Sequence, residues 1–522
     1  MSKKIILIGL IIVFIYFIIH LAIINDYGLS WDFHAHFYSG LYHLGLAYEK
    51  IKTYLPPAAS TMVDYGSIKN LNSPYGPFIS IIPTLSFILF YEKLHIFPFD
   101  SAYNFPSVIL GVLGVGVLFL FMAESIDLTA ALWGAIFLAL MPNYFGYLHY
   151  NMKDIPNAVA FALGIYLFYR LVKKERWINL FAAVLSFSLA FNIKINSFAI
   201  PIINFIWWFW VKAKEAFKKK RGLAVLYFIL APMGAVVLWW PFWTDPLGKL
   251  MEIPKFFSAN TVLAPVLFFG TTYRSGINIP WYYPYLYIGI TTPIPILVSF
   301  IFGLILSIKK IKTNIVYVLL LLWFFVPLLR FFIPNVSTLD GVRHFIEVLF
   351  PLSAIAGVGG SAIYQYVNKI DRSKILGLFL VSISIVSLTY DVLHLHPYQT
   401  SYFNSLVGGI KGANGKFDVD FWGMPQKSAM LWLNKNAPPN ASISIPMAGD
   451  TAGVYLRHDL YKNVTFMDIS QSDYTVVLNR QTFLDLYQLY HLKDFISQKT
   501  AGNKVIYKVA IDGVPLVWVI KN

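Results

Sequence analysis

Long hydrophobic runs alternate with short polar segments over the first 394 residues of the chain. A helix that crosses a hydrocarbon core of about 30 Å needs about 20 mostly apolar residues, and runs of that length recur here. We predict about 11 spans, at residues 5–24, 103–122, 130–147, 156–172, 177–193, 198–212, 223–243, 281–306, 314–333, 345–366 and 374–394. The pattern indicates a polytopic α-helical membrane protein.

Clusters of Lys and Arg mark four of the loops between these runs. They lie at residues 173–176, 212–221, 309–312 and 369–374. Cytoplasmic loops are enriched in Lys and Arg, and the predicted spans place all four loops on the same side as the N-terminus. We therefore expect a cytoplasmic N-terminus, with segments 25–75, 148–155, 244–280 and 334–344 on the opposite side.

A further hydrophobic run, at residues 76–95, is expected not to cross the membrane. The orientation requires an even number of crossings between Asp32 and Asp154, yet three hydrophobic runs lie between them. Three prolines, Pro74, Pro77 and Pro83, break the start of this run, and its end is flanked by Glu92, Lys93 and His95. We predict that it lies along the interface or re-enters the membrane.

The character of the chain changes after residue 394. The remaining residues are more polar, with β-rich runs at 442–446, 474–478, 504–509 and 516–520 and helical stretches near 425–436 and 480–496. A segment of this length can form a small domain with its own core. We predict a transmembrane domain at residues 1–394 and a small extracytoplasmic α/β domain at residues 395–522.

Composition agrees with this architecture and narrows the function. Of 522 residues, 57% are hydrophobic and 13% are charged, about half the charged share of a typical soluble domain. The formal net charge is +15, but the basic residues lie between hydrophobic runs, so nucleic acid is not an expected partner. The chain has no cysteine, which excludes disulfides, thiolate metal sites and cysteine nucleophiles.

The first external loop carries a candidate general base, Asp32, followed by His34 and His36. On a helix, Asp32 and His36 would lie on one face. Burial beside lipid would raise the pKa of the carboxyl group toward neutral pH, where it could accept a proton. A polar loop without chemistry is the alternative. A metal site needs three or four convergent ligands, and this spacing does not indicate one, although a divalent ion is compatible with it.

The second external loop places Lys153 and Asp154 just before Pro156. Proline at the start of a helix, with an aspartate beside it, is ordinary helix-capping chemistry. Ionisable residues at membrane depth are costly, however, and their cost favours a functional role. Lys153 would then face an anionic headgroup, and Asp154 would bind an acceptor or a metal.

Cations complete the candidate site. Arg343 and His344 lie just before a late span, and Arg274 lies in another segment on the same side. Arginine suits phosphate because its planar fork donates paired hydrogen bonds. Snorkelling of these side chains to the headgroup level is the alternative. Two carboxylates and several cations on one membrane face suit a phosphate-linked substrate.

The order of short motifs along the chain resembles that of a known family. The motifs are the Asp-bearing first loop, the Pro-rich segment 73–77 that contains Pro74, the Asn-Met-Lys-Asp-Ile-Pro of residues 151–156, Arg-His before a late span, His-Pro-Tyr at 396–398, Tyr-Phe-Asn at 402–404, Gly-Gly at 408–409 and Asp-Phe-Trp-Gly at 420–423. In this order they resemble the GT-C membrane glycosyltransferases, specifically the group with the protein O-mannosyltransferases and the lipid A aminoarabinose transferase. The resemblance covers roughly residues 1–430.

This resemblance implies an inverting transferase that uses a polyprenyl-phosphate sugar, with Asp32 as the catalytic carboxylate and Asp154 as the second-loop acid. Many relatives have Asp-Glu in the first loop, whereas Phe33 follows Asp32 here, so His34 or His36 would take any accessory role. We expect the substrate or its phosphate to be bound by Arg343, Lys153, Arg274, His36 and His344.

The expected function is therefore sugar transfer from a polyprenyl-phosphate donor to a lipid, glycan or protein acceptor on the non-cytoplasmic face. A multi-spanning transporter or lipid-linked-sugar flippase is the alternative, and it predicts paired repeats and helices broken at the midplane. The sequence shows no such repeat. A non-catalytic scaffold would leave Asp32 and Asp154 on one side without a role.

Overall fold

A computed structural model describes residues 2–46, 76–214, 222–243, 245–259, 264–334, 336–369, 374–465, 469, 471–486 and 491–522. Residues 73–75 of the predicted Pro-rich segment, including Pro74, lie outside the described residues, as do residues 215–221 of the strongest basic cluster.

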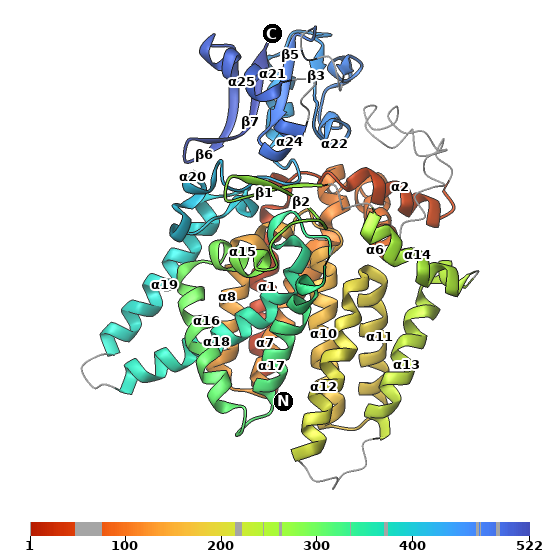
Figure 1. Ribbon diagram of the computed structural model, residues 1–522, viewed down its shortest axis with the longest axis vertical. Helices are drawn as coiled ribbons and strands as arrows, with labels where there is room; N and C mark the ends of the chain where they lie inside the picture. The colour runs from red at the N-terminus through yellow and green to blue at the C-terminus, as the bar shows by residue number, and fades with distance from the viewer. Residues whose placement is uncertain are drawn as a thin grey trace.

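A bundle of apolar helices forms the larger part of the molecule (Figure 1). Among the described residues, four helical segments are long and apolar enough to cross a membrane: α1 (Lys3–Ala22), α7 (Phe99–Ser125), α10 (Asp154–Lys173) and residues Gly341–Val367. The other helices of the bundle are α8 (Leu128–Ala139), α9 (Pro142–Tyr147), α11 (Trp177–Ile193), α12 (Ala199–Lys214), α13 (Gly222–Leu238), α15 (Tyr283–Thr291), α16 (Ile294–Lys310), α17 (Val316–Leu329), α18 (Leu349–Lys369) and α19 (Lys374–His394). The predicted polytopic helical architecture is confirmed.

The outer surface of the bundle is apolar. Helix α1 exposes a row of large aliphatic and aromatic side chains, among them Leu10, Phe14 and Ile15, each of which is about half exposed. Exposed apolar surface on this scale is unfavourable in water and favourable against lipid. The surface is therefore that of a membrane protein.

Two predicted spans are broken in the structure. The run 281–306 divides into α15 and α16 at Pro293, and the run 130–147 divides into α8 and α9 just before Pro142. Proline lacks a backbone N–H and clashes with the preceding turn, so it begins a new helix at each point. Hydrophobicity alone does not show these breaks.

Glycines allow the central helices to approach closely. A Cβ atom at Gly303 of α16 would lie 1.8 Å from Ile355 O of α18, and one at Gly359 of α18 would lie 1.9 Å from Ser299 O of α16. Small residues at such contacts are how membrane helices associate without a hydrophobic driving force between them.

The first loop lies at one end of this bundle. The turn η1 (Ile24–Asp26) is followed by α2 (Phe33–His43), and α6 (Phe78–Phe87) continues into the π-helix η2 (Ile88–Lys93). Helix α6 packs against α2 and α7. The predicted interfacial or re-entrant position of residues 76–95 stays a prediction. The later segments that are predicted to be external contain α14 (Pro246–Ala259), the hairpin β1 (Pro265–Phe268)–β2 (Thr271–Arg274) and η6 (Gly341–Val348).

The C-terminal part contains a five-stranded sheet of order β4-β3-β5-β7-β6. Strand β3 pairs in parallel with β4 and β5, and β7 pairs antiparallel with β5 and β6. The strands are β3 (Ile443–Ser444), β4 (Val464–Thr465), β5 (Tyr474–Leu478), β6 (Val505–Ile511) and β7 (Val514–Lys521), and helices α20 (Gly409–Ala413), α21 (Gln426–Asn436), α22 (Gly449–Gly453), α23 (His458–Tyr461), α24 (Gln481–Leu486) and α25 (Leu492–Ala501) accompany them. The predicted α/β character is confirmed, although the sequence does not predict the two-residue strand β4.

The sheet sits above the end of the bundle that carries α2, and the N-terminus lies toward the opposite end (Figure 1). Lys427 of α21 ties the two parts together, because its Nζ donates to Asn25 O, Tyr27 O and Asp100 Oδ2 at 2.7–2.8 Å. Apolar residues from 395–424 also join the core of the bundle rather than that of the sheet. The division at residue 394 stays a prediction.

Candidate active site

Asp32 occupies the position before the first residue of α2, the helix that lies at the end of the bundle nearest the sheet (Figure 1). Its Oδ2 accepts a hydrogen bond from Lys153 Nζ at 2.7 Å and lies 3.5 Å from Arg343 Nη1. The Asp32 side chain is 32% exposed, whereas those of Lys153 and Arg343 are 7% and 9% exposed. The structure thus places an accessible carboxylate against two buried cations.

The two cations determine the ionisation of Asp32. Burial alone would raise its pKa, but the charges of Lys153 and then Arg343 outweigh burial and hold the pKa below its ordinary value. The expectation of a raised pKa is therefore wrong for this structure, because the sequence does not show that cations from two distant segments meet at this carboxylate.

Asp154 lies in the first turn of α10 and is fully buried, at 0% exposure. The carboxylate does not cap the helix. The N-cap residue is Lys153, and its side chain does not cap the helix either. Asn151 Oδ1 accepts from Asp154 N at 2.7 Å, while Asn151 Nδ2 donates to Asp154 Oδ2 at 3.0 Å. The other carboxylate oxygen, Oδ1, contacts Lys194 Nζ at 2.7 Å. Asp154 is thus a buried anion that holds a buried cation.

Arg343 connects the two carboxylates. Its Nη1 lies 3.5 Å from Asp32 Oδ2 and 3.9 Å from Asp154 Oδ2, and its Nη2 donates to Asp340 Oδ2. The guanidinium group also lies over the ring of Trp422, 4.4 Å from its centroid. We call the six residues that these contacts join the acid–base cluster: Asp32, Lys153, Asp154, Lys194, Asp340 and Arg343.

An ion pair between Arg330 and Glu347, which is not part of the cluster, lies beside it. Arg330 Nη1 lies 3.0 Å from Glu347 Oε1, and Arg330 Nη2 donates to His344 O. The charges of Arg343, Lys194, Arg330 and Lys153 all act on the His344 side chain. His344 therefore lies close to several positive charges; its role in phosphate binding stays a prediction.

The structure brings together most of the predicted site residues. Asp32, Lys153, Asp154 and Arg343 meet directly, with His344 beside them. His36 also lies close, and burial together with the charge of Lys153 lowers its pKa to about 3. It is neutral at pH 7 and can offer a hydrogen bond but no positive charge.

Arg274 and His34 lie elsewhere. Arg274 is exposed at the end of strand β2, where its backbone N–H donates to Asn278 Oδ1 at 2.7 Å. His34 is buried on α2, where it interacts electrostatically with Asp450 of α22. The predicted participation of Arg274 receives no support from its position.

Sequence reasoning does not find Lys194, Asp340 and Arg480. Lys194 follows α11 and resembles an ordinary lysine at a helix end. Arg480 lies in the C-terminal part, yet its Nη2 is 2.8 Å from Asp340 Oδ1. Their roles depend on contacts between residues that are 40 and 140 positions apart, and no local pattern signals such contacts.

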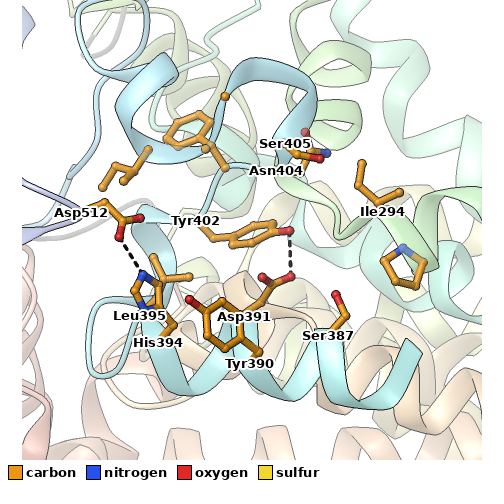
Figure 2. Close-up of a pocket in the computed structure, with 15 residues that line it drawn as sticks. Ile294, Ser387, Tyr390, Asp391, His394, Leu395, Tyr402, Asn404, Ser405 and Asp512 are labelled. Atoms are coloured by element: carbon orange, nitrogen blue, oxygen red, sulfur yellow. Dashed lines mark hydrogen bonds and ion pairs between the residues drawn. The ribbon is translucent and has the colours of Figure 1, made fainter. Parts of the chain in front are cut away.

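A separate cavity of about 490 Å³ lies at the C-terminal end of α19. Figure 2 shows Asp391 of α19 directed at Tyr402 and His394 directed at Asp512, with distances of 3.0 Å and 2.9 Å between the bonded atoms. The described residues that line this α19 cavity include two carboxylates and no Lys or Arg. The predicted Tyr-Phe-Asn and Gly-Gly motifs form part of its wall.

Within the described part of the chain, no group of three or more His, Asp or Glu side chains could hold a metal ion. The carboxylates of the acid–base cluster bind Lys and Arg instead.

Comparison with known proteins agrees with this architecture. A family model described as dolichyl-phosphate-mannose-protein mannosyltransferase matches residues 82–240. No curated protein sequence matches the chain. The matched region contains Lys153, Asp154 and Lys194 of the acid–base cluster.

Two solved structures share the fold. ArnT from Cupriavidus metallidurans in the apo state matches with a TM-score of 0.51 and 14% sequence identity, over 99% of this chain and 97% of that chain. The apo oligosaccharyltransferase from Archaeoglobus fulgidus matches with a TM-score of 0.52 and 13% identity, over 90% of this chain and 69% of that chain. The chain has the GT-C fold of these membrane glycosyltransferases, and the resemblance predicted from its sequence is confirmed. The match to ArnT also extends over the C-terminal part, which the sequence resemblance does not cover.

Proposed function

We propose that the chain is an inverting glycosyltransferase that moves a sugar from a polyprenyl-phosphate donor to an acceptor hydroxyl on the non-cytoplasmic face of the membrane. The observation that carries this proposal is an accessible carboxylate, Asp32, held against the buried cations Lys153 and Arg343. The family model matching residues 82–240, which describes a dolichyl-phosphate-mannose transferase, supports the donor class.

The cations of the cluster bind the donor phosphate in this proposal. Lys153, Lys194 and Arg343 are at most 9% exposed at their side chains, and a charge-assisted hydrogen bond is stronger where water is excluded. Arg343 offers a planar fork, and the lysines act as point charges. His344 and His36 would contribute neutral hydrogen bonds.

Asp32 accepts the proton in the transfer step. The acceptor oxygen attacks the anomeric carbon, the bond from that carbon to the phosphate oxygen breaks, and its electron pair leaves with the lipid phosphate. The acceptor proton passes to Asp32. Both cations contact Oδ2 of Asp32, so in this proposal the other oxygen, Oδ1, takes the acceptor proton. A general base typically contributes about 10²–10⁴-fold.

Donor binding prepares Asp32 for this role. In the structure Lys153 and Arg343 lower the pKa of Asp32 and make it a weak base. A bound phosphate competes for the same two cations, which weakens their hold on the carboxylate and raises its pKa toward the working range. Asp154, fully buried, keeps Lys194 and Arg343 in place.

The test is release of lipid phosphate from a polyprenyl-phosphate sugar by purified protein. Asp32→Asn should lower turnover by about 10²–10⁴-fold while the protein remains folded. Near-wild-type turnover by this variant would remove Asp32 from the mechanism. Donor binding without release by the wild-type protein would instead favour a transporter or flippase.

We also propose about 11 spans, a cytoplasmic N-terminus and a domain division near residue 394, with residues 395–522 outside the cytoplasm. The four basic clusters support this orientation. Because the chain contains no cysteine, single cysteines can be introduced without background. An impermeant maleimide applied to intact cells should label Lys504→Cys and spare Lys312→Cys until the membrane is opened. The reverse pattern would overturn the orientation.

A further inference from the structure

Arg480 is a buried arginine that the C-terminal part contributes at the edge of the acid–base cluster. It lies between β5 and α24, and its side chain is 7% exposed. Nη2 contacts Asp340 Oδ1 at 2.8 Å, and Nη1 donates to Phe421 O at 2.9 Å. The guanidinium group also lies 3.9 Å from the ring centroid of Phe483 and 5.5 Å from that of Trp31, the residue before Asp32.

Asp340 divides its carboxylate between two arginines. Oδ1 binds Arg480 and Oδ2 binds Arg343, and the side chain is 4% exposed. Its backbone is left-handed, with φ of 54°, and Gly341 follows with φ of 61°. A non-glycine residue in this conformation is uncommon and costly unless its surroundings hold it. The contacts of the side chain with both arginines therefore help to hold a strained backbone.

The same contact fixes the orientation of Arg343. One terminal nitrogen of its guanidinium group binds Asp340, so the other faces Asp32 and Asp154 at 3.5 Å and 3.9 Å. The planar group cannot keep both contacts if Asp340 rotates. Arg480 thus acts on Arg343 through a single shared carboxylate.

Arg480 also contributes to the balance of charge at the edge of the site. The acid–base cluster contains three carboxylates and three cations, and these cancel. Arg480 adds one positive charge at Asp340. The buried carboxylates Asp418 and Asp420 also act on Arg480. Buried charges interact strongly because little water screens them, so the charge of Arg480 offsets negative charge at the edge of the site that would otherwise oppose an incoming phosphate.

We propose that Arg480 is a positioning residue for donor binding: it neutralises Asp340 and so leaves Arg343 oriented and available for the donor phosphate. This inference rests on the proposed function. It assigns to the C-terminal part an indirect share in donor recognition, in addition to any contact with the acceptor.

The test is steady-state kinetics with a polyprenyl-phosphate sugar. Arg480→Gln should raise the KM for the donor by about tenfold, the size of one partly screened charge contact, with a smaller fall in kcat. A purely structural role would lower the amount of active protein and leave the KM unchanged. Arg480→Lys keeps the charge and should restore most of the wild-type KM.

Asp340→Asn supplies the decisive partner variant. Asparagine tolerates left-handed backbone and removes the carboxylate that Arg480 neutralises, so the double variant with Arg480→Gln should have a lower donor KM than Arg480→Gln alone. If the double variant has the same KM as Arg480→Gln, or a higher one, the inference is overturned. This comparison remains informative even if Arg480→Gln alone folds poorly, because the double variant leaves no unpaired carboxylate at residue 340. Its donor KM should equal that of Asp340→Asn alone, since Arg480 acts on Arg343 through that carboxylate.

Arg457 provides a matched control in the same part of the chain. It also bonds an aspartate and backbone carbonyl oxygens, at Asp459, Ala437 and Pro438, away from the cluster. Arg457→Gln should keep the wild-type donor KM. If Arg480→Gln keeps the wild-type donor KM while Asp32→Asn is inactive, the inference about Arg480 is overturned but the proposed function stands. Activity of Asp32→Asn would instead reject the proposed function.

Discussion

The acid–base cluster and the α19 cavity are two polar regions built in opposite ways. The cluster brings buried cations from three segments against carboxylates, with side chains of Lys153, Lys194 and Arg343 at most 9% exposed. The α19 cavity offers about 490 Å³ of space, but its described lining has carboxylates and no Lys or Arg. Phosphate binding depends on Lys and Arg side chains that donate charge-assisted hydrogen bonds, and a cavity without them does not provide these contacts. Under the proposed function, the comparison therefore favours the cluster over the α19 cavity as the place where the donor phosphate binds.

Arg343→Lys should produce the largest loss of activity among the variants that probe this difference. Lysine keeps the charge but cannot reach Asp340, Asp32 and a phosphate with one planar fork. We expect kcat/KM for the donor to fall by about tenfold to 100-fold, equivalent to one strong charge-assisted hydrogen bond. Wild-type kcat/KM in this variant would contradict the proposed role of the guanidinium group.

Lys194→Met tests the buried pair on the other side of the cluster. Removing the lysine leaves the fully buried Asp154 without its 2.7 Å partner, and breaking such a pair typically costs about 3–5 kcal/mol. We expect a clearly lower thermal unfolding midpoint in detergent. Adding Asp154→Asn should recover much of that stability, since no buried charge remains unpaired, but should not recover activity. Equal stability of the single and double variants would show that the pair is not coupled.

Asp420 offers a contrast beside the cluster, because it is buried without an ion pair among the described residues. Burial raises its pKa to about 6 despite a hydrogen bond from Gly423 N. The protonated form is therefore favoured by folding, and its stabilisation is present below about pH 4 and is lost as the pH rises through 6. The full difference is about 3 kcal/mol.

Asp420→Asn should remove this pH dependence. The variant should be more stable than the wild-type protein at pH 7, and the difference in unfolding midpoint should vanish near pH 4. Midpoints measured at pH 4, 5, 6 and 7 provide the check. A constant difference across this range would mean that Asp420 does not titrate as its surroundings indicate.

Asp391→Asn in the α19 cavity should have the smallest effect. Its carboxylate accepts from Tyr402 at 3.0 Å and contacts no residue of the cluster. Asparagine can keep that hydrogen bond, so we expect less than about a twofold change in donor kcat/KM. A tenfold loss in a correctly folded variant would show that the cavity takes part in donor binding and would break the comparison.

The sequence predicts much of the membrane part because hydrophobic period and length are local properties. The predicted spans 177–193 and 374–394 coincide with α11 and α19, and Asp32, Lys153, Asp154 and Arg343 are conspicuous as ionisable residues near helix ends. The breaks at Pro142 and Pro293 are less evident, since proline is tolerated in apolar segments.

What the sequence does not show is how these residues pair. Asp340 and Arg480 are 140 positions apart, and Lys194 reaches Asp154 across 40 positions. Pairing of this kind depends on tertiary packing, and so does the sign of a pKa shift. The sequence predicts a raised pKa for Asp32 from burial, whereas the structure adds the cations that lower it.

The central claim is that Asp32 and the donor phosphate share Lys153 and Arg343. Equilibrium binding of polyprenyl phosphate, with the uncharged polyprenol as reference, tests this directly in wild-type protein and in Asp32→Asn. We predict that the variant binds the phosphate severalfold more tightly than the wild-type protein, although it transfers sugar far more slowly, and that polyprenol binds both proteins equally. Weaker phosphate binding by Asp32→Asn, or equal affinity for phosphate and polyprenol, would contradict the account.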